Sequence, residues 1–274
     1  VLFGSMDGAL HLVNADDGKE EVAVIPKSMM IAQPEALVDG SIKPRVGEPY
    51  FGVDAPWLVT TDYDFDLPGK RVKVEEVAGK KGMFAYGGLR MGGQAFYGMN
   101  ISERADPKII FTITPDGLNY TASNDFKRLG QIWSKPTAAK VRLTRDAEPI
   151  DVLIFGGGYD KCYEDPTFKL NSTTNNVTDC SNITQAKGNA VYIADASTGA
   201  LITSISGSTA GGTNVSVPTM KHSIVSEITT LDRDNDGVID HLYFGDLGGQ
   251  VYRVDLQNGQ TSSSTLVRRV TRVL

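Results

Sequence analysis

Apolar residues along this chain mostly alternate with polar ones or come in short runs rich in β-branched and aromatic side chains. Both patterns are typical of β-strands. Gly, Asp, Asn and Pro separate the clearest runs, which are residues 9–13, 109–113, 152–155, 190–194 and 241–244. The nearest approach to a helical pattern is residues 28–38, and Pro34 interrupts it. The pattern therefore predicts a mostly β protein.

A strand-and-turn unit recurs at residues 8–18, 189–199 and 249–259. Each unit has an Asp or Asn followed by a Gly at the same offsets; these pairs are Asn14 and Gly18, Asp195 and Gly199, and Asp255 and Gly259. A polar cap followed by glycine at positive φ turns one strand tightly into the next. Repeated units of a few antiparallel strands predict an all-β fold, a modified, irregular β-propeller with long loop insertions.

The number of units also bears on how much of a propeller the chain holds. The units are too few for the usual closed ring, and apolar runs stand at both ends of the chain. We expect residues 1–274 to be one propeller-like domain, incomplete or excised from a larger chain. Within it we expect a long polar loop at 159–189 and a metal-binding blade at about 217–260.

Composition narrows the classes of protein that fit this fold. The chain has 27 basic and 33 acidic side chains, a net charge of −6 and a pI near 5.1. Bulk charge therefore argues against a protein that binds nucleic acid or docks on an anionic membrane. No run approaches the ~20 apolar residues that a transmembrane helix needs. The 29 glycines, above the usual ~7% of residues, fit many tight turns.

The most specific motif of the sequence is an acidic stretch at residues 232–240. Oxygen side chains stand at its positions 1, 3, 5 and 9, and Gly237 at position 6 allows a tight bend. Hard carboxylate and carbonyl oxygens are the ligands that Ca²⁺ prefers. The expected ligands are Asp232, Asp234, Asp236, Asp240 and the carbonyl of Val238.

The flanks of this motif read as strands, so it predicts a calcium-binding hairpin turn within one blade. It is not an EF-hand, because Tyr243 stands where that loop has a Glu. The alternative is an acidic, solvated turn without metal. Magnesium fits less well, since it prefers fewer protein ligands and strict octahedral geometry. Asp62, Asp64 and Asp66 form a weaker version, which we interpret as a polar hairpin turn rather than a second metal site.

Cys162 and Cys180 both lie in the polar loop at 159–189. Paired, they would stabilise the protein by ~3 kcal/mol on loop-entropy arithmetic and would favour an extracytoplasmic compartment. The alternative is two free thiols. Because both fall in one otherwise unanchored loop, we expect a disulfide.

No catalytic constellation is visible in the sequence. The glycine-rich stretch at 86–94 has no helical pattern after it, so blade turns explain it better than a nucleotide site. His11, His222 and His241 are scattered, and His11 and His241 fall within strand runs. We therefore expect no enzymatic activity.

Three stretches together carry a resemblance to a known family. They are residues 4–18, residues 194–200, and above all the acidic motif with the following strand at 243–256. They resemble the C-terminal domain of the PilC/PilY family, the type IV pilus tip-associated adhesins and biogenesis factors of Gram-negative bacteria. The resemblance spans nearly the whole chain.

The resemblance implies an irregular β-propeller with calcium bound at residues 232–240. It also implies that calcium occupancy regulates pilus extension and retraction, and with them twitching motility and surface attachment. The implied partners are the pilus machinery, such as minor pilins or the pilus tip, and host-cell or abiotic surfaces. The implied location is the pilus tip, the outer membrane surface or the periplasm.

Two other classes compete with this interpretation. The repeated turn also resembles the blades of quinoprotein dehydrogenases, in part at residues 194–199. Against that enzyme class, the vicinal cysteine pair typical of the quinoprotein alcohol dehydrogenases is missing, and only Trp57 and Trp133 could stack on a quinone. The third class is a generic calcium-stabilised propeller that binds a receptor or a carbohydrate.

Overall fold

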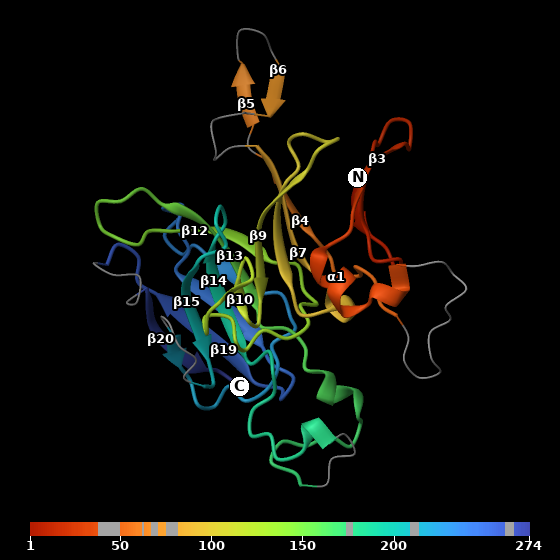
Figure 1. The fold of residues 1–274 in the computed structure, drawn as a ribbon. Coiled ribbons are helices and arrows are strands. Elements are labelled where there is room, and N and C mark those ends of the chain that lie inside the picture. The colour runs from red at the N-terminus through yellow and green to blue at the C-terminus, as the bar shows by residue number, and fades with distance from the viewer. Residues whose placement is uncertain are drawn as a thin grey trace.

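The computed structural model describes residues 1–37, 50–61, 63–66, 71–74, 82–173, 178–208, 214–260 and 266–274. In these ranges the chain forms successive, mostly antiparallel β-sheets, each built from strands close together in sequence (Figure 1). The predicted runs lie in strands of these sheets, so the prediction of a mostly β protein is confirmed.

The first two sheets contain the N-terminal half of the chain. The first has the order β1 (Leu2–Gly4), β2 (Leu10–Val13), β3 (Glu20–Val24). The second has the order β11 (Thr121–Ala122), β10 (Gly117–Leu118), β9 (Lys108–Thr114), β8 (Phe96–Asn100), β7 (Met83–Gly88), β4 (Leu58–Thr61). The separate hairpin of β5 (Tyr63–Asp66) and β6 (Arg71–Val74) is inserted between β4 and β7 and stands away from the sheets (Figure 1).

The third and fourth sheets contain the C-terminal half. The third has the order β12 (Thr137–Val141), β13 (Ile150–Gly156), β14 (Ala190–Asp195), β15 (Leu201–Ser206), β16 (Asn214–Ser216). The fourth has the order β17 (Thr229–Leu231), β18 (His241–Gly245), β19 (Val251–Leu256), β20 (Val267–Arg272). All neighbours in these two sheets are antiparallel except β15 and β16, which are parallel.

In the described ranges, helical structure is confined to short segments. They are α1 (Lys27–Ala32) and the 3₁₀ turns η1 (Pro34–Leu37), η2 (Arg90–Gly92), η3 (Lys161–Glu164) and η4 (Thr178–Cys180). The weak helical pattern of the sequence thus gives one helix, which ends before Pro34. The glycine-rich stretch at 86–94 leads from β7 through η2 toward β8, as expected of a blade turn.

Apolar clusters lie between successive sheets and hold them together. One joins the first and second sheets through Leu10 and Tyr97. Another joins the second and third, where the rings of Phe96 and Phe155 stack with centroids 4.3 Å apart. The third and fourth sheets share a cluster that includes Val141. Sheets that follow one another and pack through shared cores are the arrangement of propeller blades.

The fold is an irregular β-propeller. In the part of the chain that the structure describes, no strand pairing joins the first sheet to the last. The inserted hairpin and the parallel β16 also depart from a regular blade. Fold class is therefore as predicted.

The repeated glycines adopt the backbone conformation expected of them. Gly18, Gly199 and Gly259 have φ values of 72°, 72° and 73°. Asp195 also behaves as predicted, because its Oδ1 accepts hydrogen bonds from the N–H groups of Ser197 and Thr198 at 2.9 Å. In the third unit, Asp255 instead pairs with the side chains of Arg253 and Arg269.

The weaker acidic motif is placed differently from its prediction. Asp62 lies outside the described residues, and Asp64 and Asp66 belong to strand β5, paired with β6, rather than to a turn.

Candidate metal centre

The acidic motif forms the connection between β17 and β18, as the flanking strand patterns predicted. Leu231 pairs with His241 at the base of this hairpin, and the Asp240 N–H donates to the Leu231 carbonyl at 2.8 Å. Asn235 and Gly237 have φ values of 61° and 88°. Such left-handed residues let the chain coil tightly over residues 232–240. We call this segment the acidic loop.

Backbone N–H groups hold the loop's carboxylates in place. Asp232 accepts from the N–H of Asn235 at 2.7 Å and from that of Gly237 at 2.9 Å. Asp240 accepts from the Arg233 N–H at 2.7 Å. These bonds direct the carboxylates toward the inside of the turn.

The resulting oxygen cluster has the dimensions of a calcium site. Asp232, Asp234 and Asp240 each offer a carboxylate oxygen, and these oxygens lie within 4.8 Å of one another. Two oxygens that bind one Ca²⁺ at 2.3–2.6 Å can be at most about 5 Å apart. The donor set, all oxygen, is also the one that Ca²⁺ prefers. These residues therefore fit the metal that the sequence predicts.

The other two expected ligands lie beside this trio. Asp236 accepts a hydrogen bond from the Val238 N–H at 3.0 Å, and the Val238 side chain is buried, with 1% exposed. Both residues line an open cavity of about 370 Å³, together with Asp234 and Asp240. The structure thus brings Asp232, Asp234 and Asp240 together and places Asp236 and Val238 in the same loop, along the same cavity as Asp234 and Asp240.

Residues that the sequence pattern did not connect with the acidic loop also line this cavity. They come from the β12–β13 turn and from the turn after β19: Arg142, Arg145, Asn258, Gly259 and Gln260. Their proximity to the acidic loop depends on how two blades pack, and no local spacing encodes it.

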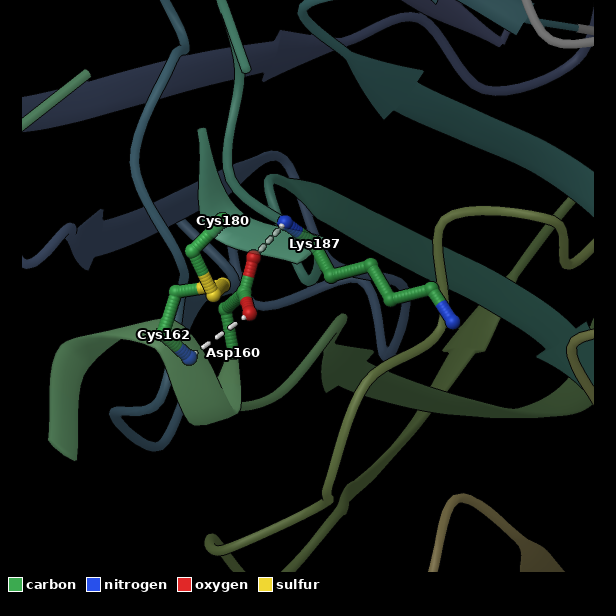
Figure 2. The surroundings of a disulfide bond; sticks show 4 residues. All are labelled: Asp160, Cys162, Cys180 and Lys187. Carbon is green, nitrogen blue, oxygen red and sulfur yellow. Dashed lines mark hydrogen bonds between the residues drawn. A yellow bond between two sulfur atoms is a disulfide. The ribbon is translucent and has the colours of Figure 1, made fainter. Parts of the chain in front are cut away.

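The predicted disulfide is present in the structure. Cys162 and Cys180 are bonded, with Cα atoms 5.7 Å apart, and both are buried. Figure 2 shows the buried Asp160 beside it, accepting hydrogen bonds from the N–H groups of Cys162 at 3.0 Å and Lys187 at 2.6 Å. Asp160 and the disulfide thus fasten the start of the polar loop to its end.

Two other residues that the sequence analysis considered, Trp133 and His11, contact neighbouring side chains. The rings of Trp133 and Tyr159 pack with their centroids 4.4 Å apart, and the Arg90 guanidinium lies 4.7 Å from the centroid of the Trp133 ring. His11 lies in β2, where its bond with Glu20, at 2.6 Å, raises the pKa of the imidazole. No helix in the described ranges has the length and apolar character to cross a membrane.

Comparison with known proteins gives a consistent family assignment. Residues 167–272, which include the acidic loop and the whole fourth sheet, match the model of the PilY1 β-propeller domain. Over these residues the chain is similar to the PilY1 β-propeller domain. The resemblance seen in the sequence is thereby confirmed.

The chain spans less than half the length of the two PilY1 chains that it matches. The chain is 25% identical over 256 residues to the type IV pilus biogenesis factor PilY1 of Pseudomonas aeruginosa (strain UCBPP-PA14), covering 93% of this chain and 17% of that protein. It also superposes on the crystal structure of the Pseudomonas aeruginosa PilY1 C-terminal domain with a TM-score of 0.57 at 21% identity. That match covers 97% of this chain and 43% of the other, and it shows a shared fold.

Proposed function

We propose that this chain is the calcium-binding C-terminal propeller of a type IV pilus biogenesis factor and adhesin. In this proposal, calcium occupancy of the acidic loop regulates pilus extension and retraction, and so twitching motility and surface attachment. The PilY1 propeller match and the pilus biogenesis factor among its relatives support the pilus assignment. The partners we propose are the pilus machinery and the surfaces to which the pilus attaches.

One observation carries the calcium part of the proposal. Three carboxylates converge within 4.8 Å at a hairpin turn, where mutual repulsion opposes the fold. A bound calcium ion would supply the charge that neutralises them. Asp232, held by two backbone N–H groups, and Asp240, held by one, would keep the loop in shape for it.

The buried disulfide supports an extracytoplasmic location. Disulfides persist in oxidising compartments such as the periplasm and the cell surface, and are rare in the cytosol. The Cys162–Cys180 bond closes a loop within the chain, and such a bond stabilises a protein mainly by restricting the unfolded state.

The calcium site and its role are tested by removing two ligands. Asp234→Ala with Asp236→Ala takes two carboxylates from the loop and leaves in place the hydrogen bonds that Asp232 and Asp240 accept. We expect calcium affinity, measured by isothermal titration calorimetry, to fall on the order of 100-fold, because affinity follows the charge count of the ligands. In the bacterium, we expect the same variant to change surface piliation and twitching.

A matched control removes two carboxylates at another blade turn. Asp16→Ala with Asp17→Ala changes the exposed turn between β2 and β3 by the same charge. We expect calcium affinity and twitching to stay at wild-type values. Calcium binding that survives in the acidic-loop variant would refute the ligand assignment. Loss of calcium with unchanged motility would refute the regulatory role.

A further inference from the structure

The acidic loop lies at the seam between the third and fourth sheets. The two sheets share an apolar cluster in which Val141 of β12 and Ile239 of the loop are both buried. At the other end of β17, the Thr137 hydroxyl donates to the Ile228 carbonyl at 2.7 Å. The third and fourth sheets are therefore in contact at both ends of β17.

A backbone hydrogen bond across this seam fixes one of the expected calcium ligands. The Ile239 N–H donates to the Lys140 carbonyl of β12 at 3.0 Å. That N–H belongs to the same planar peptide unit as the Val238 carbonyl, so the two groups point in opposite directions. The neighbouring blade therefore sets the direction of the Val238 carbonyl.

Asn258 adds a second link at the same place. Its Nδ2 donates to the Ile239 carbonyl at 2.9 Å, and its Oδ1 accepts from the Arg142 N–H at 2.9 Å. The next residue, Gly259, donates its N–H to the Arg142 carbonyl at 2.8 Å. One amide side chain thus bonds the end of the acidic loop and the end of β12 simultaneously.

We propose that Asn258 is a positioning residue for the calcium site. Through the Ile239 carbonyl it holds Ile239 beside β12, next to the peptide unit that carries the Val238 carbonyl, so that calcium binding and closure of the seam between the third and fourth sheets are coupled. This inference rests on the proposed calcium function of the acidic loop. Coupling of this kind is reciprocal: whatever the seam adds to calcium affinity, calcium adds to closure of the seam.

The first test is Asn258→Ala, which removes both side-chain hydrogen bonds and no carboxylate. We expect calcium affinity of the 274-residue chain to fall about 5- to 10-fold by titration calorimetry, with the far-ultraviolet circular dichroism unchanged. The matched control is Asn14→Ala, since Asn14 also accepts one backbone N–H and donates one hydrogen bond at a blade turn, far from the loop in sequence. We expect wild-type affinity there.

A second measurement needs no variant. Hydrogen exchange, followed by mass spectrometry, reports on the amides of Arg142 and Gly259 in fragments covering 138–146 and 256–260. Saturating calcium is expected to slow their exchange by about tenfold in the wild-type chain. In Asn258→Ala, calcium is expected to protect the acidic loop but not residues 138–146. A merely structural role for Asn258 would leave the calcium effect on 138–146 in place.

The outcomes separate this inference from the function on which it rests. No calcium binding by the wild-type chain would overturn the proposed function. Calcium binding that is equal in wild type and Asn258→Ala would overturn only the coupling. Calcium-independent exchange of the 138–146 fragment in the wild type would also overturn it, even if the variant failed to fold.

Discussion

Two turns with the same sequence pattern lie at the ends of corresponding strands, one at 195–199 and the other at 255–259. Gly199 and Gly259 have nearly equal φ values of 72° and 73°. In the first turn, the Gly199 N–H bonds back to the Asp195 carbonyl at 2.9 Å, so the turn is closed on itself. In the second, the Gly259 N–H bonds to Arg142 of the neighbouring sheet.

The two aspartates differ in the same way. Asp195 accepts from backbone and hydroxyl groups of its own turn. Asp255 is buried and pairs with Arg253 and Arg269, at 2.6 Å in each case. The repeat therefore fixes the backbone path, whereas the contacts of the turn depend on the neighbouring strand. Among the described residues of the two turns, only the one after β19 is hydrogen-bonded to the neighbouring blade.

Replacing Gly199 or Gly259 by alanine should give the largest difference in stability between the two turns. Both positions lie in the left-handed region, where a side chain costs about 1 kcal/mol. A Cβ at Gly199 would also lie 2.6 Å from the Phe111 ring, whereas the nearest atom at Gly259 is the Arg145 Cα at 3.5 Å. We expect Gly199→Ala to lose about 2–4 kcal/mol and Gly259→Ala about 1 kcal/mol in denaturant unfolding.

Gly18→Ala is the control for this comparison, because nothing lies within 4 Å of its Cβ position. Gly18→Ala should lose about as much stability as Gly259→Ala. Equal losses at Gly199 and Gly259 would show that the two turns meet their neighbouring sheets in the same way, against the structure.

Replacing the two aspartates should give a smaller difference in the free energy of unfolding. Asp255→Asn weakens charge-assisted bonds to two arginines, and we expect a loss of about 2 kcal/mol at pH 7. Asp195→Asn weakens bonds to neutral donors, for which about 1 kcal/mol is expected. Chemical denaturation at low and at high salt distinguishes the two, because only the Asp255 term should shrink with ionic strength. If the stability loss of Asp195→Asn also shrank at high salt, the proposed difference between the two aspartates would be wrong.

The dependence on pH sharpens the same comparison. Burial raises the pKa of Asp255, but hydrogen bonds from Arg269 and Arg253 outweigh it, and the pKa lies below its usual value. Burial likewise raises the pKa of Asp195, where bonds from Ser197 and Thr198 outweigh it. The pKa of each aspartate is lower in the folded protein than in the unfolded chain, where it is about 4. The stabilisation that each carboxylate gives is therefore present above about pH 4 and is lost as pH falls through the pKa of the folded state. Each variant should therefore lose less stability than wild type on acidification.

Much of this could be predicted from sequence because it is local. Strands such as β13 and β14, the positive φ of Gly199 and the convergence of Asp232 with Asp240 all depend on residues a few positions apart. The hydrogen bond between Arg142 and Asn258 could not be predicted, because the two residues lie 116 positions apart and meet only when two blades pack. The ion pair between Asp255 and Arg269 was missed for a related reason. The repeat pattern predicts that Asp255 caps its own turn, whereas its carboxylate pairs with Arg269 of β20.

The central claim is that the acidic loop binds calcium and that the bound ion stabilises the fold. Its most direct test is denaturant unfolding of the wild-type chain and of the Asp234→Ala, Asp236→Ala variant, with and without calcium. At calcium 100 times above the dissociation constant, the wild-type chain should gain about 2.7 kcal/mol, and the variant should gain almost nothing at the same concentration. An equal gain in both chains, or no gain in the wild type, would contradict the account.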